Sequence, residues 1–266
     1  MSINQPHARP IPRSVRWDGT LAMLRNPYYF ISDECRQAES DVVAGRLFLQ
    51  PAIFMTGARA AALFYDNELF LRRGAAPEPL RATLFGKGGV QGLDGDLHRH
   101  RKAMFLHVLS PVGLAKLSFT AADEWERRSA GWLRDGTVAL YPAAQAWLAR
   151  SACAWAGIPL RDNADAALRT HQMTLLFDQA AAPWQQLRVR WARWRCESWL
   201  ASIVRDARSH RLPLLPGSAA EAVAFFRDER GRYLPAPVAA VELLNLLRPL
   251  TAVSVYVAFA AHALHA

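Results

Sequence analysis

Few cysteines and few lysines occur in this 266-residue sequence, and both shortages narrow the possible classes of protein. The three cysteines, Cys35, Cys153 and Cys196, are widely spaced and form no Cys-x-x-Cys pair, so neither a disulfide framework nor a zinc site is indicated. His98 and His100 are a poor metal pair because residues two apart on a helix point to different sides. We therefore expect no side-chain metal site and a reducing, cytoplasmic location.

The sequence also lacks a long uninterrupted apolar run. Residues 1–17 contain no hydrophobic segment of the kind found in secretory signals. The most apolar stretch, residues 250–266, is shorter than the ~20 residues that span a bilayer, and it contains Thr251, Ser254 and two histidines. We expect a buried core helix there and no transmembrane segment.

Positive charge is abundant, with a net charge of +9 and a pI of about 10.1. Nucleic-acid binding is one interpretation, but the arginines are scattered among many alanines, which favours a compositional bias, and we expect no nucleic-acid partner. Residues 188–199, RVRWARWRCESW, interleave aromatic residues with arginines, as nucleic-acid or membrane-surface segments can. We expect instead that the tryptophans pack inward and the charges are solvated.

Helical periodicity dominates the chain from Asp94 onward. It predicts helices over residues 94–109, 111–133, 141–157, 163–181, 184–209 and 237–266. Before that point, short helices are expected over 17–30, 35–45 and 58–65, and a small hairpin over 46–57, where Pro51 interrupts apolar and β-branched residues. The predicted fold is mainly α, with a small β part near the N-terminus, in a single domain over residues 1–266.

A basic helix start poses the first chemical question. The stretch GGVQGLDGDLHRHRKAMF, which begins at Gly88, places histidines, arginines and a lysine at a helix N-terminus, where positive charge is unfavourable unless an anion lies opposite. His98 and Lys102 are four residues apart and share one face. The upstream glycines lack the P-loop arrangement that cradles phosphates. The alternative is a solvated basic face partnered by Asp94 and Asp96.

A lone cation inside a long apolar helix poses the second chemical question. Arg248 stands immediately before Pro249 and among leucines, where an unpaired guanidinium costs several kcal/mol. Glu242 lies about 240° away around the helix and is not its obvious partner. Pro249 also removes a helical hydrogen bond and frees the carbonyl of Asn245. Two irregularities at one place suggest a site; the alternative is an arginine that reaches the surface or pairs with a distant acid.

Three segments, LFGKGGVQGLDGDLHRHRKAMF, ACAWAGIPL and ELLNLLRPLTAVS, resemble the cytochrome P450 superfamily. Within it they resemble the bacterial fatty-acid peroxygenases, which hydroxylate long-chain fatty acids with hydrogen peroxide. The resemblance runs from about Ile11 to the last residue, and its most specific element is the Arg-Pro pair. It implies the N-terminal portion of the P450 fold and heme as the cofactor.

The resemblance also implies roles for individual residues. His98 and Lys102 match the positions that bind a heme propionate. Arg248, followed by Pro249, matches the arginine that holds the substrate carboxylate over the iron, and that carboxylate does the acid–base work of splitting the peroxide O–O bond.

Further positions bear on the oxidant and the product. Gln91 matches a position beside the heme where hydroxylating members carry glutamine, and Phe85 would line the acyl channel. P450 monooxygenases that use oxygen carry an acid–alcohol pair in the long helix, whereas here Leu250 precedes Thr251. The resemblance therefore implies fatty acid and hydrogen peroxide as reactants, with no reductase partner.

One departure from the family concerns the iron ligand. None of the three cysteines lies in the pattern Phe-x-x-Gly-x-x-x-Cys-x-Gly that supplies the thiolate. We therefore expect an incomplete domain without its proximal, cysteine-bearing part, which is inactive alone, binds hemin weakly and gives no thiolate-type Soret band. Two alternatives stay open: a non-catalytic helical remnant without heme, and a basic helical protein that binds surfaces through residues 188–195.

Overall fold

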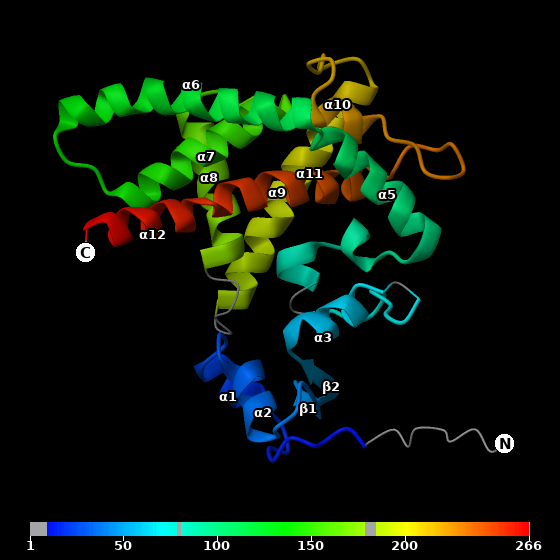
Figure 1. The fold of residues 1–266 in the computed structure, drawn as a ribbon. Helices are drawn as coiled ribbons and strands as arrows, with labels where there is room; N and C mark the ends of the chain where they lie inside the picture. The colour runs from blue at the N-terminus through cyan, green and yellow to red at the C-terminus, as the bar shows by residue number, and fades with distance from the viewer. Residues whose placement is uncertain (1–9, 67, 79–80, 179–184, 266) are drawn as a thin grey trace. The chain divides into compact units, whose positions relative to one another are not determined.

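The computed structural model describes residues 10–66, 68–78, 81–178 and 185–265, and the chain forms two compact units, Met1–Leu71 and Arg72–Ala266 (Figure 1). Helices predominate, and among the described residues the strands lie in the first unit, so the predicted mainly α fold with a small β part is confirmed. The prediction that residues 1–266 form a single incomplete domain stays a prediction.

The first unit combines short helices with one hairpin. Its elements are α1 (Thr20–Arg25), α2 (Phe30–Gln37), β1 (Val42–Leu47), β2 (Gln50–Met55) and α3 (Gly57–Phe64). The strands are antiparallel, with Arg46 opposite Pro51, which confirms the predicted hairpin. The helix predicted over residues 35–45 is wrong beyond Gln37, because the backbone from Val42 onward is hydrogen-bonded to β2.

A small apolar core holds this first unit together. It contains Phe30 and Cys35 from α2, Val43 from β1 and Phe54 from β2, all at most 5% exposed. The rings of Phe30 and Phe54 meet edge to face with centroids 5.2 Å apart, a favoured geometry for aromatic pairs. The hairpin is therefore stabilised by packing against α2.

The second unit is helical throughout its regular elements. These are η1 (Arg81–Phe85), η2 (Val90–Gly92), α5 (Gly95–Val108), α6 (Pro111–Asp135), α7 (Leu140–Ala156), α8 (Asn163–Asp178), α9 (Gln186–Arg208), α10 (Ala219–Ala224), α11 (Ala236–Ala252) and α12 (Ser254–His265). The predicted long helices are confirmed to within a few residues, except that residues 179–184 lie outside the described part. One helix was predicted from residue 237 to the end, but it breaks at Val253.

α11 is the central helix of this unit. It packs against α7, α8, α9 and α10, and Figure 1 shows α9 crossing it at a steep angle. Leu243, Leu244 and Leu247 are completely buried, and burial of each such side chain stabilises the fold by about 1.5–3 kcal/mol. At its end the backbone N–H of Val253 donates to the carbonyl of Leu250 at 3.3 Å, three residues back, as the helix tightens.

α12 is far more exposed than the predicted core helix. Tyr256, Phe259 and Leu264 are 73%, 66% and 90% exposed. Among the described residues, one helical stretch, Ala236–His265, is long and apolar enough to cross a membrane, and α5 with α6 would pass the same test as a bent pair. A buried core helix passes it too, so the stretch does not by itself indicate a membrane protein.

Candidate functional site

A glycine-rich loop, residues 86–89, lies directly on α11. A Cβ atom on Gly86 would stand 2.7 Å from Val241, one on Gly89 would stand 3.0 Å from the same side chain, and one on Gly88 would stand 3.2 Å from Val238. Gly86 also has a φ of +81°, which side chains rarely adopt. Glycine thus lets this loop approach the central helix and brings Gln91 beside it.

Gln91 is the first member of a polar network that reaches the basic helix. The amide nitrogen of Asn245 donates to Gln91 Oε1 at 3.1 Å and to Glu242 Oε2 at 3.3 Å. Arg101 Nη1 donates to Glu242 Oε1 at 2.7 Å, and their side chains are 11% and 0% exposed. Burial raises the pKa of Glu242, and the hydrogen bond and charge of Arg101 oppose that rise. The network joins α5, η2 and α11.

The sequence left open a solvated basic face at the start of α5, partnered by Asp94 and Asp96. The structure bears out only part of this alternative. Asp96 pairs with Arg99 at the surface, as that alternative expected. Asp94 is used differently: its carboxylate accepts backbone N–H bonds from Arg72 at 2.6 Å and Arg73 at 3.0 Å. These bonds, led by that of Arg72, lower the pKa of Asp94. Asp94 thus holds the preceding chain through backbone bonds, while its charge still favours the protonated form of His98.

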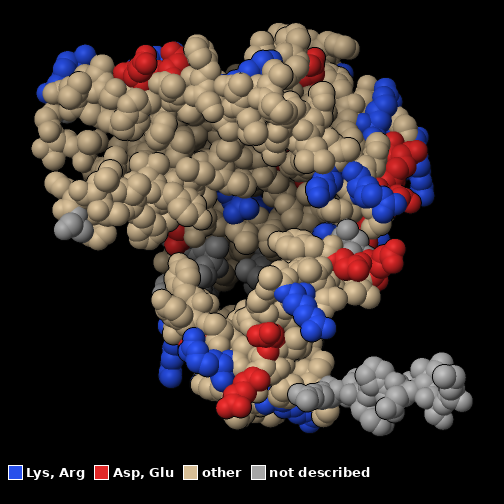
Figure 2. Space-filling view, viewed as in Figure 1, with Lys and Arg blue, Asp and Glu red and all other residues tan. Residues whose placement is uncertain are grey.

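His98 and Lys102 lie one turn apart on α5. His98 is half-buried and Lys102 is exposed. Burial lowers the pKa of His98, and the charges of Arg72 and Lys102 lower it further. A neutral imidazole beside a lysine cation still offers N–H donors to an anion. Figure 2 shows basic side chains interspersed with acidic ones over this part of the surface.

Arg248 is half-buried near the C-terminal end of α11, one turn beyond Asn245. Its Nε is buried without a hydrogen-bond partner, and no carboxylate lies within ion-pair distance, in the part of the chain that the structure describes. Burial, and then the like charge of Arg193, lowers the pKa of Arg248 to about 10. The guanidinium is thus neither in bulk water nor locked to an internal acid, and it is still protonated at neutral pH.

A second buried arginine, Arg193 on α9, was missed in the sequence. Its side chain is 3% exposed; Nε donates to Glu197 at 2.6 Å and Nη1 donates to the carbonyl of Thr83 at 3.1 Å. Nη2 is buried and has no partner among the described residues. Arg193 thereby fixes η1, which ends at the half-buried Phe85. Its spacing of four residues from Glu197 was the available signal.

The structure thus brings five elements together, η1, η2, α5, α9 and α11. The loop places Gln91 on α11, the bond between Arg101 and Glu242 ties α5 to the same helix, and Arg193 ties η1 to α9. Pro249, next to Arg248, is exposed. Among these side chains, Arg193 Nη2 and Arg248 Nε are buried and without a partner in the described part of the chain, so they can donate to an anionic ligand.

Comparison with solved structures decides the family, although no family model matches the chain. Cytochrome P450SP alpha (CYP152B1) in complex with (R)-ibuprophen has 41% sequence identity and a TM-score of 0.89, over 93% of this chain. Cytochrome P450EX alpha (CYP152N1) with myristic acid has 36% identity and a TM-score of 0.89, over 97% of this chain. The chain belongs to the cytochrome P450 superfamily. The resemblance carried by the three quoted segments is confirmed.

The match to these P450 structures covers only part of their length. This chain spans 61% of cytochrome P450SP alpha and 62% of cytochrome P450EX alpha. A variant of cytochrome P450 OleT in complex with arachidonic acid has 25% identity and a TM-score of 0.90, and 62% of it is covered. The similarity supports a P450-like heme enzyme, and the chain matches part of the P450 fold.

The cysteines of this partial P450 do not fit a heme-iron ligand. Cys153 and Cys196 are 1% and 0% exposed, and burial raises their pKa values to about 12. Only the thiolate binds a metal, so both are inert thiols at neutral pH. Cys35 is buried in the small core of the first unit. The cysteines of this chain therefore do not fit the heme iron, whereas His98 and Lys102 carry N–H groups suited to an anion.

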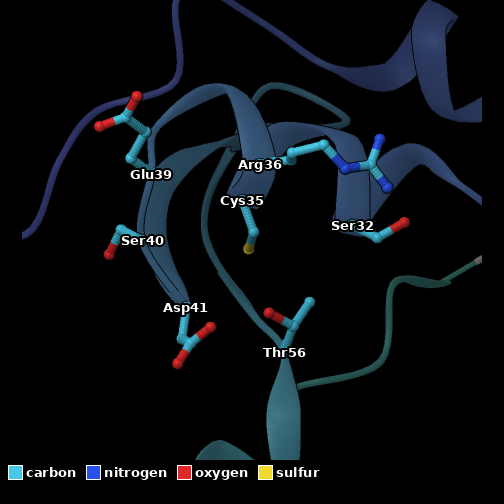
Figure 3. Close-up of a pocket in the computed structure, with 7 residues that line it drawn as sticks. All are labelled: Ser32, Cys35, Arg36, Glu39, Ser40, Asp41 and Thr56. Atoms are coloured by element: carbon cyan, nitrogen blue, oxygen red, sulfur yellow. The ribbon is translucent and has the colours of Figure 1, made fainter.

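A cavity of about 460 Å³ in the first unit is unrelated to the predicted site (Figure 3). It is lined, among the described residues, by Ser32, Cys35, Arg36, Glu39, Ser40, Asp41 and Thr56. This mostly polar lining does not suit an acyl chain. None of the site residues predicted from the sequence is among these seven.

Proposed function

We propose that this chain is part of a heme-dependent, monooxygenase-type oxidoreductase that hydroxylates fatty acids with hydrogen peroxide, and that Arg248 binds the substrate carboxylate. The carrying observation is the half-buried guanidinium of Arg248, whose buried Nε has no partner among the described residues. An unpaired buried charge costs several kcal/mol. A carboxylate would offset this cost through charge-assisted hydrogen bonds to the guanidinium, which are among the strongest in proteins.

Neighbouring residues position that head group. Pro249 lies inside α11 and cannot donate a helical hydrogen bond, so the carbonyl of Asn245, one turn earlier, loses its usual helical donor. Asn245 holds the carbonyl end of Gln91 at 3.1 Å, which turns the amide nitrogen of Gln91 the other way and leaves it to donate to a bound oxygen. Phe85 supplies apolar surface for the acyl chain.

His98 and Lys102 are proposed to hold the heme propionates at the start of α5. The bound heme would supply the oxidising chemistry, while the residues of this chain bind and orient the substrate. None of the three cysteines of this chain fits the thiolate ligand of the heme iron. This observation favours a second candidate function, that of a non-catalytic helical protein without heme. The first candidate is preferred because it gives the Arg248 guanidinium a partner.

The state of Thr251 supports peroxide as the oxidant and the absence of a reductase. Its hydroxyl is fully buried and donates to the carbonyl of Leu247 at 3.0 Å. The hydroxyl is thus bonded within the helix, and the preceding residue, Leu250, supplies no acid for a proton relay. Three buried free thiols are suited to a reducing cytoplasm, which we propose as the location.

Fatty acids are the proposed substrate class because related structures hold them. Cytochrome P450EX alpha is described with myristic acid and the OleT variant with arachidonic acid. Both ligands, like (R)-ibuprophen in cytochrome P450SP alpha, carry a carboxylate on an apolar body. A half-buried arginine beside apolar surface has the matching chemistry.

The experiment compares myristate binding by the purified chain and its Arg248→Leu variant, using calorimetry. We expect the variant to bind about 10- to 100-fold more weakly, because a charge-assisted hydrogen bond is lost. Myristyl alcohol should bind both proteins equally. Thermal stability without ligand should be unchanged or raised, since an uncompensated buried charge is removed. Arg134→Leu, at an exposed site, is the matched control. Equal myristate affinity in the Arg248 variant would refute the role of Arg248.

A further inference from the structure

An apolar stripe is exposed along the first half of α9. Leu187, Trp191 and Trp194 are 83%, 55% and 57% exposed. Their spacing of four and three residues places them on one face of the helix. The expectation that the tryptophans pack inward is wrong for Trp191 and Trp194, because Val189 and Cys196, each fully buried, occupy the inward face.

Arginines flank this stripe on both sides. Arg188, Arg190 and Arg195 are exposed, and the guanidinium of Arg195 lies 5.6 Å from the centroid of the Trp191 ring. Arg190 pairs with Glu78 at 2.6 Å. Arg188 and Arg195 have no ion-pair partner among the described residues. The face therefore combines contiguous apolar area with two uncompensated cations.

This combination matches the interface of an anionic bilayer. Tryptophan rings favour the depth of the lipid headgroups, where their apolar body is buried and their N–H stays hydrated. Arginines at the same depth attract anionic phosphates. Leu187 has no ring on which a nucleobase could stack, so a bilayer fits the whole stripe better than a nucleic acid does.

We propose that the α9 face formed by Leu187, Arg188, Trp191, Trp194 and Arg195 docks on the surface of an anionic lipid bilayer. The docking is peripheral: the tryptophans enter the headgroup region and the two arginines bind lipid phosphates. Because it rests only on α9, this surface activity is independent of whether the chain binds heme or a fatty acid.

Co-sedimentation of the purified chain with vesicles tests the proposal. Vesicles of phosphatidylcholine with phosphatidylglycerol should bind the protein, phosphatidylcholine vesicles should bind it at least about 10-fold more weakly, and added salt should weaken binding. The Arg188→Gln/Arg195→Gln variant should lose about 30-fold in affinity for the anionic vesicles. Trp191→Ser/Trp194→Ser should lose at least about 10-fold, because two interfacial rings are removed.

Matched substitutions on another helix provide the control. Phe119 is 75% exposed and Arg134 is exposed, both on α6, so Phe119→Ser/Arg134→Gln removes similar groups elsewhere. This control should bind within about 2-fold of the original protein, since α6 takes no part in docking. Circular dichroism should show the same helix content for all variants.

Three results would overturn the proposal. Equal binding to both vesicle types would show that lipid charge does not contribute to docking. Unchanged binding of both α9 variants would place the contact elsewhere, for instance on the exposed residues of α12. Loss of retention on DNA in the α9 variants, with vesicle binding unchanged, would assign this face to a nucleic acid.

Discussion

α11 and α12 follow one another in the sequence and are both apolar, yet they are buried to very different degrees. α11 hides Leu243, Leu244 and Leu247 completely, whereas α12 exposes Tyr256 and Phe259. The difference lies in the neighbours, because α7, α8, α9 and α10 surround α11, while α7 is the main contact of α12 in the described part of the chain. Apolar composition thus predicts a helix that needs a partner, but not whether it has one.

The largest expected effect comes from the polar network that fixes α11. Glu242→Ala leaves the buried guanidinium of Arg101 without its carboxylate, and should lower the free energy of unfolding by about 3–5 kcal/mol. Urea denaturation gives this value. The control is Asp206→Ala, which breaks an ion pair to Arg211 at the surface and should cost at most about 1 kcal/mol. Equal losses in both variants would mean that the network does not stabilise α11.

Paired truncations on the two helices test the comparison itself. Leu247→Ala in α11 removes a fully buried side chain and should cost about 2–5 kcal/mol, because it leaves a cavity. Phe259→Ala in α12 removes a side chain that is 66% exposed and should change stability by less than about 0.5 kcal/mol. Thermal unfolding of both variants measures the difference. A large loss in the α12 variant would show that Phe259 has a buried partner.

The loop over α11 should contribute a smaller effect. Gly86→Ala forces a left-handed residue to carry a Cβ against Val241 and Arg193, and should cost about 1–3 kcal/mol. Gly92→Ala is the control, since its Cβ would meet nothing within 4 Å. The denaturant concentration at the unfolding midpoint is measured for both variants. Equal midpoints would mean that the loop does not cover α11 tightly.

The smallest expected effect is that of pH on myristate affinity near neutral pH. The pKa of Arg248 is about 10 in the folded chain, so the guanidinium stays protonated and affinity should be constant from about pH 7 to 9. Above about pH 10 affinity should fall with rising pH, because the binding charge is lost, and myristyl alcohol should show no such fall. Affinity for myristate that is constant to pH 11 would mean that burial does not lower the pKa of Arg248.

Local signals predicted most of the fold. Periodicity placed α5 through α9 and α11 within a few residues, and the apolar and β-branched residues around Pro51 indicated the hairpin. They failed between residues 38 and 45, where pairing with β2 overrides a helical composition, and at Trp191 and Trp194, where tertiary packing selects the face that turns inward.

The candidate site was predicted only in part, for a related reason. Arg248 stood out because a lone cation in an apolar helix is visible in the sequence. Arg193 did not, because it is surrounded by other arginines and its burial depends on Thr83, 110 residues away. The bond between Arg101 and Glu242 joins residues 141 apart, and no local pattern encodes such a pair.

The ionisation of a bound fatty acid tests the central claim most directly. Myristate labelled with ¹³C at its carboxyl carbon can be titrated by NMR while bound to the chain and to the Arg248→Leu variant. If Arg248 binds the head group, the pKa of the carboxyl should lie below that of free myristate in the original chain and at or above it in the variant. A bound carboxyl whose pKa is not lowered, or is the same in both proteins, would contradict the account.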